Sequence, residues 1–500
     1  MKKTPIYIAA AVGIVAIAYT GASWWAGKQA EVTLEKQHKL IADLPYFVVK
    51  SRSYQRGLFT SHERTTIGLN GTLLQPYVEM LKMAGEEVPN LQVTYTQTIH
   101  HGPLPRLLQG DFTPLKADVV TDIEFSAESQ KWLTKVFGDQ KPLQIENRIR
   151  FNDDGVFTVK IPSFTYEETL AKVKSEWKGF DSSIAYGGDF NRIDIKAVAP
   201  GLRFEAGPKG TFEIKNLNFE THNERGAAGI MLGTGKLTLD SAALKLTEGD
   251  KPLDIKLEGI NYLVETKADG DFINSTGDIG LKSIVLNDKA YGPAKLSVAA
   301  NHLHAPTLYV LKEAVAKIER EVTDPKEQAR KMFDVFRKQG LPLLKNDPSL
   351  AIKELSVKLP EGEVSVHANL ALKGFQDSDL DTPIKLLERL QAHADLTLPK
   401  QVIETYVLWQ ARGMIATDTE SGEHPDTSDL DNLARNLMES QIHKLLDHNL
   451  IREQGDMLST SAEWNAGQLS VNGQGVPLPW QVPPPGAMPE AAPANPGKKK

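Results

Sequence analysis

The stretch "EVSVHANLALKG" (residues 363–374) decides the fold class, because apolar and polar residues alternate along it. One parity of this stretch is entirely apolar: Val364, Val366, Ala368, Leu370 and Leu372. Successive side chains of a strand point to opposite faces of the sheet, so a period of two predicts a strand with one buried face and one wet face. Strands of this kind are typical of antiparallel sheets.

The same alternation recurs along the chain, for example in "LQVTYTQ" (residues 91–97) and "LDIKLEG" (residues 253–259). Turn signals separate such stretches at residues 152–155, 361–362 and 472–473. Helical patterns cover residues 308–338, with Pro325 restarting the helix, and residues 382–394, 401–414 and 431–452. We therefore expect an α+β fold that is β-rich and elongated, with a mostly antiparallel curved sheet and interleaved packing helices. Weak repeats near residues 211, 278 and 349 are consistent with repeated sheet units.

The N-terminus is apolar, with no charged residue between Lys3 and Lys28. Roughly twenty apolar residues suffice to cross a hydrocarbon core of about 30 Å as a helix. Lys2 and Lys3 favour a cytoplasmic N-terminus, and Trp24 and Trp25 lie where an interfacial aromatic belt is expected. A cleaved signal peptide is the alternative, since residues 20–22 are small enough for a peptidase. The sequence thus predicts a single-pass membrane protein whose body lies outside the cytoplasm.

Composition excludes several classes of protein. The chain has no cysteine, so disulfides, thiol nucleophiles and thiolate metal sites are ruled out. A formal net charge of -7 gives no electrostatic footprint for nucleic acid. The expected organisation is a cytoplasmic N-terminus (1–4), a transmembrane anchor (5–26), a β-rich body of two or three lobes outside the cytoplasm (27–474) and a proline-rich, disordered tail (475–500).

The segment "YQRGLFTS" (residues 54–61) groups residue types that also occur in active sites, including Arg56 and Ser61. Tyr54 and Phe59 are apolar positions of a strand, and Gly57 interrupts the pattern as a bulge would. The chain contains no Gly-x-Ser-x-Gly elbow. We interpret the segment as structural, a strand and bulge just outside the membrane.

For the other motifs we favour structural over functional interpretations. His100 and His101 in "HHGPLPR" could bind a metal only in a turn, and His302 and His304 lack a third ligand. "SEWK" (residues 175–178) matches Ser-x-x-Lys without its companion motifs, and "DSDLDTP" (residues 377–383) is better explained as an N-cap than as a calcium loop. The sequence predicts no catalytic residue, cofactor or metal.

Several motifs, in order, resemble the YdgA family of bacterial inner-membrane proteins, which have a periplasmic body and a domain of unknown function. These motifs are "SWWAGKQAE", "YQRGLFTS", "HHGPLPR", "LPLLKNDPSLAIKELSV", "LQAHADLTLPK" and "WNAGQLSVNGQ". The resemblance implies a periplasmic body on an uncleaved anchor and carries over no catalytic residue. The signature positions are Tyr54, Arg56, Gly57, Phe59, Ser61, His101, Gly102, Pro103, Asn472 and Gly473.

The later motifs also resemble, more loosely, the AsmA-like envelope proteins. That resemblance implies a long curved sheet with an apolar interior that moves phospholipid between membranes. The sequence therefore predicts a non-enzymatic role in envelope lipid handling or scaffolding, with phospholipid or envelope proteins as partners. An uncovered apolar groove would favour lipid handling, and a filled core would favour scaffolding. The alternative is a periplasmic hydrolase whose site, drawing on His101 and Arg56, no motif reveals.

Overall fold

The computed structural model describes residues 4–43, 47–69, 92–170, 172–247, 252–322, 324–416 and 428–478 of the chain. The chain divides into two compact units. Unit 1 comprises residues 1–348 and 356–360, and unit 2 comprises residues 349–355 and 361–500. Strand β18 (Ser349–Leu359) is divided between them.

The helices of unit 1 are interleaved with its strands along the chain. They are α1 (Thr4–Asp43), η1 (Leu107–Gln109), α3 (Ala127–Phe137), η2 (Gly207–Lys209), α4 (Ala305–Glu321), α5 (Pro325–Gln339) and α6 (Leu341–Lys345). Helix α5 starts as the sequence predicts, with Pro325 in its first turn and the Asp324 carboxylate accepting a hydrogen bond from the Lys326 amide.

The strands of unit 1 follow one another as an antiparallel sheet. They are β1 (Phe47–Gln55), β2 (Thr60–Leu69), β3 (Gln92–His101), β4 (Ala117–Glu124), β5 (Gln144–Ile149), β6 (Gly155–Ile161), β7 (Phe164–Glu168), β8 (Val173–Trp177), β9 (Phe180–Tyr186), β10 (Arg192–Ala206), β11 (Gly210–Arg225), β12 (Met231–Leu246), β13 (Leu253–Asp269), β14 (Phe272–Leu281), β15 (Ser283–Leu286), β16 (Lys289–Tyr291) and β17 (Ala294–His304).

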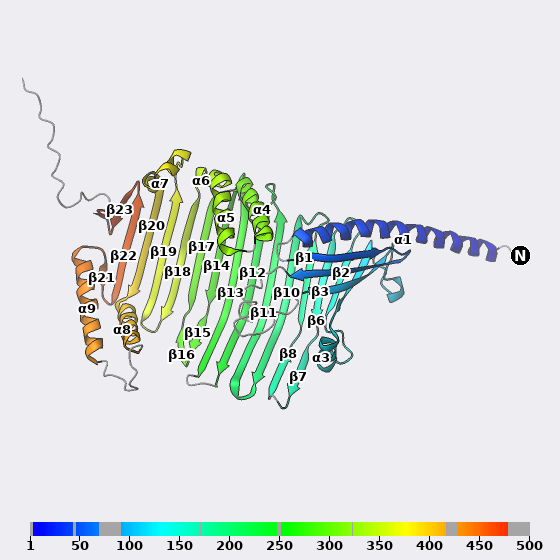
Figure 1. The fold of residues 1–500 in the computed structure, drawn as a ribbon, viewed down its shortest axis with the longest axis horizontal. Coiled ribbons are helices and arrows are strands. Elements are labelled where there is room, and N and C mark those ends of the chain that lie inside the picture. Colours follow the sequence, from blue (N-terminus) through cyan, green and yellow to red (C-terminus); the bar gives the residue numbers. More distant parts are fainter. Residues whose placement is uncertain are drawn as a thin grey trace, which may run out of the picture. The chain divides into compact units, whose positions relative to one another are not determined.

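The strand order is β1-β2-β3-β4-β5-β6-β9-β10-β11-β12-β13-β14-β17. Strand β8 pairs with the second half of β10 and also with β7, while β15 pairs with β13 and with β16. Nearly every neighbour in the sheet is also the neighbour in sequence, so short turns build most of it. Helix α1 lies along β1 and contacts β3 and β4 (Figure 1).

The main core of unit 1 lies between α1 and the first strands of the sheet. Ala30 and Leu34 of α1 pack against four buried sheet residues: Ile99, Ala117, Val119 and Ile149. All four of these sheet residues are completely buried, at 0% exposure. The C-terminal half of α1 is therefore part of the body.

Unit 2 contains a smaller antiparallel sheet with two helices on it. Its elements are β19 (Gly362–Leu372), η3 (Asp377–Asp381), α7 (Pro383–Arg389), β20 (Leu390–Pro399), α8 (Lys400–Ala416), α9 (Ser428–Asp447), β21 (Arg452–Gln454), β22 (Met457–Asn465), β23 (Gln468–Val471) and β24 (Gln474–Val476). Strand β20 pairs with both β19 and β22. Met438 and Ile442 of α9 pack with Leu458 of β22 and Ile403 of α8, which forms a second core.

The β-rich, mostly antiparallel sheet is confirmed, and the stretch that opened the sequence analysis is strand β19. Two boundary predictions are wrong. Residues 390–394 are strand β20 and not helix, because they pair on both sides, and the tail starts later than 475, because β24 pairs with β23. The interpretation of residues 377–383 as an N-cap agrees with the structure: Thr382 is the N-cap of α7, although its side chain makes no capping hydrogen bond, and residues 377–381 form η3.

Three other expectations are not settled by the described residues. Most of the tail (479–500), the polar connector from residue 418 and residues 1–3 lie outside them. Among those that are described, no helix meets the length and hydropathy of a membrane span, so the anchor predicted over residues 5–26 is not confirmed and stays a prediction.

Candidate functional site

Helix α1 docks on the sheet through its smallest residues. Ser23, Ala26, Gly27 and Ala30 are spaced three or four apart and therefore share one helix face, and all are buried. A Cβ atom on Gly27 would lie 2.5 Å from Cε1 of His101, which is closer than real contacts allow. Glycine is required there because the histidine ring lies directly against the helix backbone.

His101 is the centre of this docking site. Its ring is 2% exposed, its Nδ1 lies 3.0 Å from the carbonyl oxygen of Ser23, and its Nε2 lies 3.0 Å from Oγ of Ser61. A carbonyl oxygen only accepts, so Nδ1 carries the proton and Nε2 accepts from the serine hydroxyl. Burial lowers the pKa of His101, which keeps the ring neutral. The side chain thus joins β2, β3 and α1 through two hydrogen bonds.

The other signature residues of the motif "YQRGLFTS" contact α1 or the core beneath it. Tyr54 packs against the core, and Arg56 forms a 3.1 Å ion pair with Glu31 and lies over the Trp24 ring. The Phe59 ring stacks on Tyr19 of α1, with ring centroids 6.3 Å apart. Residues of the motif "YQRGLFTS" therefore hold α1 against the sheet. These contacts agree with the structural interpretation of the motif.

Two glycines of these motifs occupy tight positions. Gly57 lies in the turn that joins β1 to β2, so the predicted bulge is instead a hairpin connection, where a Cβ would lie 2.2 Å from the Thr60 carbonyl oxygen. Gly102 has a φ of +138°, and a Cβ there would lie 2.6 Å from Oγ of Ser23. Pro103 follows directly, in the β3–β4 connection.

Two polar clusters hold α1 further along its length. Lys116, which is 3% exposed, and Thr33 both donate to Oδ1 of Asp153. Hydrogen bonds from Lys116 and Thr33 outweigh the effect of burial and hold the pKa of Asp153 below its usual range. No motif predicts this cluster, because its members are far apart in sequence and each residue type is common.

The second cluster is a closed cycle of hydrogen bonds. Gln37 donates to the Tyr186 hydroxyl, which donates to Asn147, which donates back to Gln37, at 2.9, 2.7 and 2.9 Å. Burial raises the pKa of Tyr186 to about 12, so the hydroxyl keeps its proton. Together the two clusters fix the rotation of α1 on the sheet.

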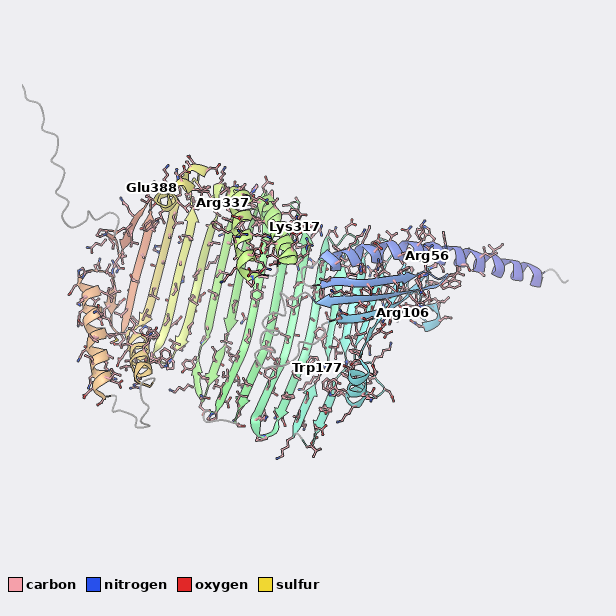
Figure 2. The ribbon with its side chains drawn as sticks, viewed as in Figure 1. Arg56, Arg106, Trp177, Lys317, Arg337 and Glu388 are labelled. Carbon is pink, nitrogen blue, oxygen red and sulfur yellow. The ribbon has the colours of Figure 1, made fainter. Side chains whose placement is uncertain are left out.

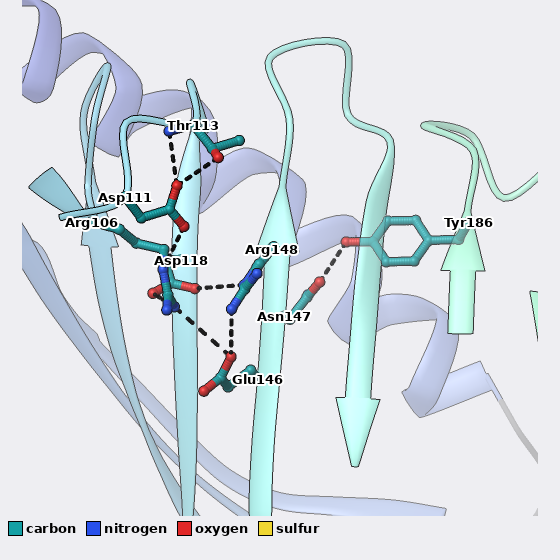
Figure 3. Close-up of polar contacts among 8 residues, drawn as sticks. All are labelled: Arg106, Asp111, Thr113, Asp118, Glu146, Asn147, Arg148 and Tyr186. Carbon is teal, nitrogen blue, oxygen red and sulfur yellow. Dashed lines mark hydrogen bonds and ion pairs between the residues drawn. The ribbon is translucent and has the colours of Figure 1, made fainter. Parts of the chain in front are cut away.

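The opposite face of β4 and β5 carries an ion-pair network (Figure 3). Nη1 of Arg106 lies 2.9 Å from Oδ2 of Asp118, a carboxylate that is 1% exposed, and Nε of Arg106 lies 3.1 Å from Asp111. Arg148 lies 3.9 Å from the other oxygen of Asp118. An open cavity of about 510 Å³ lies beside this network, and its lining includes Arg148, Arg150 and Lys160. Arg106 thereby ties the β3–β4 connection to the sheet.

The face on which α1 docks continues across the sheet as an apolar surface. Residues that pair directly across neighbouring strands share a face. One such row runs from β10 to β17, and these six residues define what we term the apolar face: Ala197, Phe219, Leu237, Tyr262, Ile279 and Leu296. Tyr262 is 38% exposed and Ile279 is 46% exposed. The adjacent row on this face passes through Ile195 and, strand by strand, reaches Val119 and Ile99 beneath α1.

The other side of the same strands is polar. The row one residue away consists of Lys196, Glu220, Lys236, Leu263, Asp278 and Ser297. Lys196 and Glu220 form a 3.1 Å ion pair across β10 and β11. The sheet is therefore strongly two-sided, and Leu263, at 44% exposure, is the one apolar residue in this polar row.

The remaining sequence candidates lie in separate places. His100 contacts Thr60 on the side opposite His101, His302 and His304 both contact the Phe272 ring, and Ser175 is a residue of β8. Asn472 and Gly473 form the β23–β24 turn of unit 2, where the Asn472 side chain bonds Ser461 and Asn449. Within the described residues, no group of three or more histidine and carboxylate side chains is placed to hold a metal ion.

Comparison with known proteins identifies the family. The family model described as "Bacterial protein of unknown function (DUF945)" matches residues 1–479. The chain belongs to the DUF945 family. Protein YdgA of Escherichia coli (strain K12) is 24% identical over 507 residues, covering 94% of each chain. The family resemblance stated from the motifs is therefore confirmed, and no solved structure matches this DUF945 protein.

A pH prediction follows from the burial of His101. Burial holds the folded-state pKa of His101 below the ordinary histidine value of about 6.5, so the unfolded chain binds the proton more tightly. The docking of α1 is expected to be strongest above pH 6.5 and to weaken as the pH falls below it. Hydrogen exchange of the α1 amides, measured between pH 7.5 and pH 5.5 and corrected for intrinsic rates, should show this loss.

The variant His101→Gln should flatten that profile, because its side chain does not titrate. Burial also lowers the pKa of His38, so His38→Gln is the matched control and should retain most of the pH dependence. An unchanged profile in His101→Gln would assign the effect to another group. The pKa of Asp153 lies below the ordinary aspartate value of about 3.9, so Asp153 does not contribute in this pH window.

Proposed function

We propose that this DUF945 protein is a membrane-anchored, periplasmic lipid-handling protein whose apolar face binds the acyl chains of phospholipid. The observation that supports this proposal is the row of apolar side chains that begins on the same sheet face as α1 and in which Tyr262 and Ile279 are 38% and 46% exposed. Large exposed apolar patches in soluble bodies mark binding surfaces. A polar substrate would gain nothing from this face.

The dimensions of the apolar face suit an acyl chain. Neighbouring strands lie about 4.8 Å apart, so the five steps from β10 to β17 span about 24 Å. One acyl chain covers about half of a hydrocarbon core of about 30 Å. Each methylene group removed from water stabilises the complex by about 0.8 kcal/mol. The face is long enough to hold a whole chain lying across the strands.

The placement of α1 supports entry of lipid from a membrane. If residues 5–26 span the bilayer, the docked part of α1 holds the first strands of the sheet close to it. The row through Ile99 and Val119 is buried beneath α1 and continues into the apolar face, so the apolar face lies on the side of the sheet that carries α1. The positive residues Lys2 and Lys3 support a periplasmic body.

The test compares two apolar residues on opposite faces. Ile279→Lys places a charge on the apolar face, and Leu263→Lys places it on the polar face at a nearly equal starting exposure of 44% against 46%. We expect Ile279→Lys to lower the phospholipid bound to the purified protein by about tenfold, which corresponds to about 1.4 kcal/mol. Native mass spectrometry, after gentle removal of detergent, measures the bound lipid.

Leu263→Lys should retain wild-type lipid. Equal loss in both variants would point to general destabilisation. A wild-type protein without lipid would reject lipid binding and favour a scaffolding role, to be followed by crosslinking of envelope partners.

We propose a non-enzymatic role, and the Ser61–His101 pair gives the hydrolase alternative a specific form. The serine donates to Nε2 as a nucleophile donates to its base, but both side chains are buried beneath α1 and the third group is a backbone carbonyl. A fluorophosphonate probe labels activated serines. Labelling of the wild type that disappears in Ser61→Ala would support the hydrolase, and we expect no labelling.

A further inference from the structure

Three turns of unit 1 gather at one end of the sheet, beside α1. They are the turn after β1, the β3–β4 connection and the turn after β5, which follow Gln55, His101 and Ile149. Antiparallel pairing of β1 with β2, β3 with β4 and β5 with β6 places all three at the same end. Figure 2 shows Arg56 of the first turn at the helix, whereas Arg106 of the second turn lies across the first strands, where it pairs with Asp118.

These turns expose large apolar side chains to an unusual degree. We term them the collar: Leu58, Phe59, Leu107, Leu108, Phe112 and Phe151. Leu108 is 102% exposed and Phe112 is 68% exposed. Turns are normally polar, and burying a leucine or phenylalanine side chain is worth about 1.5–3 kcal/mol. A collar of such side chains requires an apolar surrounding.

The collar is continuous with the exposed apolar surface of α1. Phe59 stacks on Tyr19, and Phe151 stacks on Trp25 with ring centroids 6.2 Å apart. Further toward the N-terminus, Ile14 and Ile17 are 68% and 76% exposed. The apolar surface thus passes from the helix to the turns after β1 and β5, and the Tyr19 hydroxyl joins α1 to the β3–β4 connection by donating to the Leu104 carbonyl oxygen at 3.1 Å.

Most charges around the collar are neutralised or positive; the exception is Asp154, in the turn after β5, whose carboxylate accepts hydrogen bonds from the Asn152 side chain and the Gly188 amide. Glu31 is paired with Arg56, and Asp111 is paired with Arg106. Lys28 and Arg150 are exposed at the same end. Aromatic rings and arginine or lysine side chains with apolar stems are typical of the membrane interface, and they favour anionic headgroups.

We propose that the collar inserts into the interface of the lipid bilayer and seats this end of the sheet on the membrane surface. The occupant is a bilayer and not a second copy of the chain, because the collar continues an apolar helix and the exposed cations Lys28 and Arg150 lie at the same end. This inference rests on the anchoring that the proposed function includes. It adds a second contact with the membrane, made by the body itself.

The chain has no cysteine, so single cysteines report on single sites. The full-length variants Leu108→Cys and Leu170→Cys place an environment-sensitive fluorophore at two leucines that are 102% and 95% exposed. Leu170 lies in the turn between β7 and β8, and β8 pairs with the second half of β10, at the other end of the sheet. Each labelled protein is reconstituted into vesicles of phosphatidylcholine and phosphatidylglycerol.

The label at residue 108 should shift its emission to the blue and lose most of its intensity to lipids that carry a quencher near the headgroup. The label at residue 170 should respond to neither. Phe112→Cys repeats the measurement at a second collar site. If the 108 and 112 labels remain as water-exposed as the 170 label, or if quenching occurs only between protein copies, the proposal is wrong.

The outcome is separable from that of the proposed function. Lipid quenching at residue 108 with no lipid bound to the apolar face would keep the collar and reject acyl-chain binding. Lipid bound to the apolar face without quenching at residue 108 would keep acyl-chain binding and reject insertion of the collar. A failure of anchoring itself would appear as protein that does not float with the vesicles.

Discussion

Arg106→Gln is expected to destabilise unit 1 by about 3–5 kcal/mol, because it leaves the buried carboxylate of Asp118 without its partner. Oδ1 of Asp118 has no hydrogen-bond partner, and Arg148, 3.9 Å away, is 44% exposed, so little remains to compensate the charge (Figure 3). Urea unfolding of the detergent-purified protein should show an earlier first transition.

The matched control is Arg64→Gln. Arg64 forms a shorter contact, 2.6 Å, with Glu124, but both side chains are solvent-exposed, at 58% and 37%. Solvent screens such a pair, so its loss should change stability little. An equal loss of unfolding free energy in the two variants would show that the burial of Asp118 does not determine the effect of Arg106→Gln.

A double variant separates the charge from the contact. Arg106→Gln combined with Asp118→Asn removes both charges and should recover a large part of the lost stability. The connection between β3 and β4 also depends on Arg106 through Asp111. Arg106→Gln should therefore loosen the turn that carries Leu107 and Leu108, and hydrogen exchange of residues 102–116 should rise.

Gly27→Val is expected to undock α1, at a cost of about 1–3 kcal/mol. The added side chain would enter the His101 ring, which two hydrogen bonds and burial hold in place. The ring cannot move aside without losing its bonds to Ser23 and Ser61. Hydrogen exchange and proteolysis should both increase in the C-terminal half of α1.

Gly21→Val is the control on the same helix, because nothing lies within 4 Å of a Cβ at Gly21. The two substitutions carry the same cost in helix propensity, so their difference measures the contact with the sheet. If both variants keep α1 docked, the close approach at Gly27 is not required for docking.

Sequence could predict the signature residues but not their partners. "YQRGLFTS" and "HHGPLPR" are visible as motifs, but the sequence does not show that residues of both motifs contact α1 and hold it on the sheet. His101 bonds a carbonyl 78 positions away, and Thr33 bonds Asp153 at a separation of 120. Neither pairing has a local pattern, because it depends on where a distant helix docks.

Local patterns by themselves determined the β-rich class, the antiparallel strands and the restart of the helix at Pro325, since alternation and capping act within a few residues. They failed at residues 390–394, where pairing with β19 and β22 overrides helical periodicity. Tertiary structure alone decided that α1 continues to Asp43 as part of the core and that the apolar face begins on the same side of the sheet. The physical reason is register: which residues share a face across many strands depends on the pairing of every neighbour, which no single strand encodes.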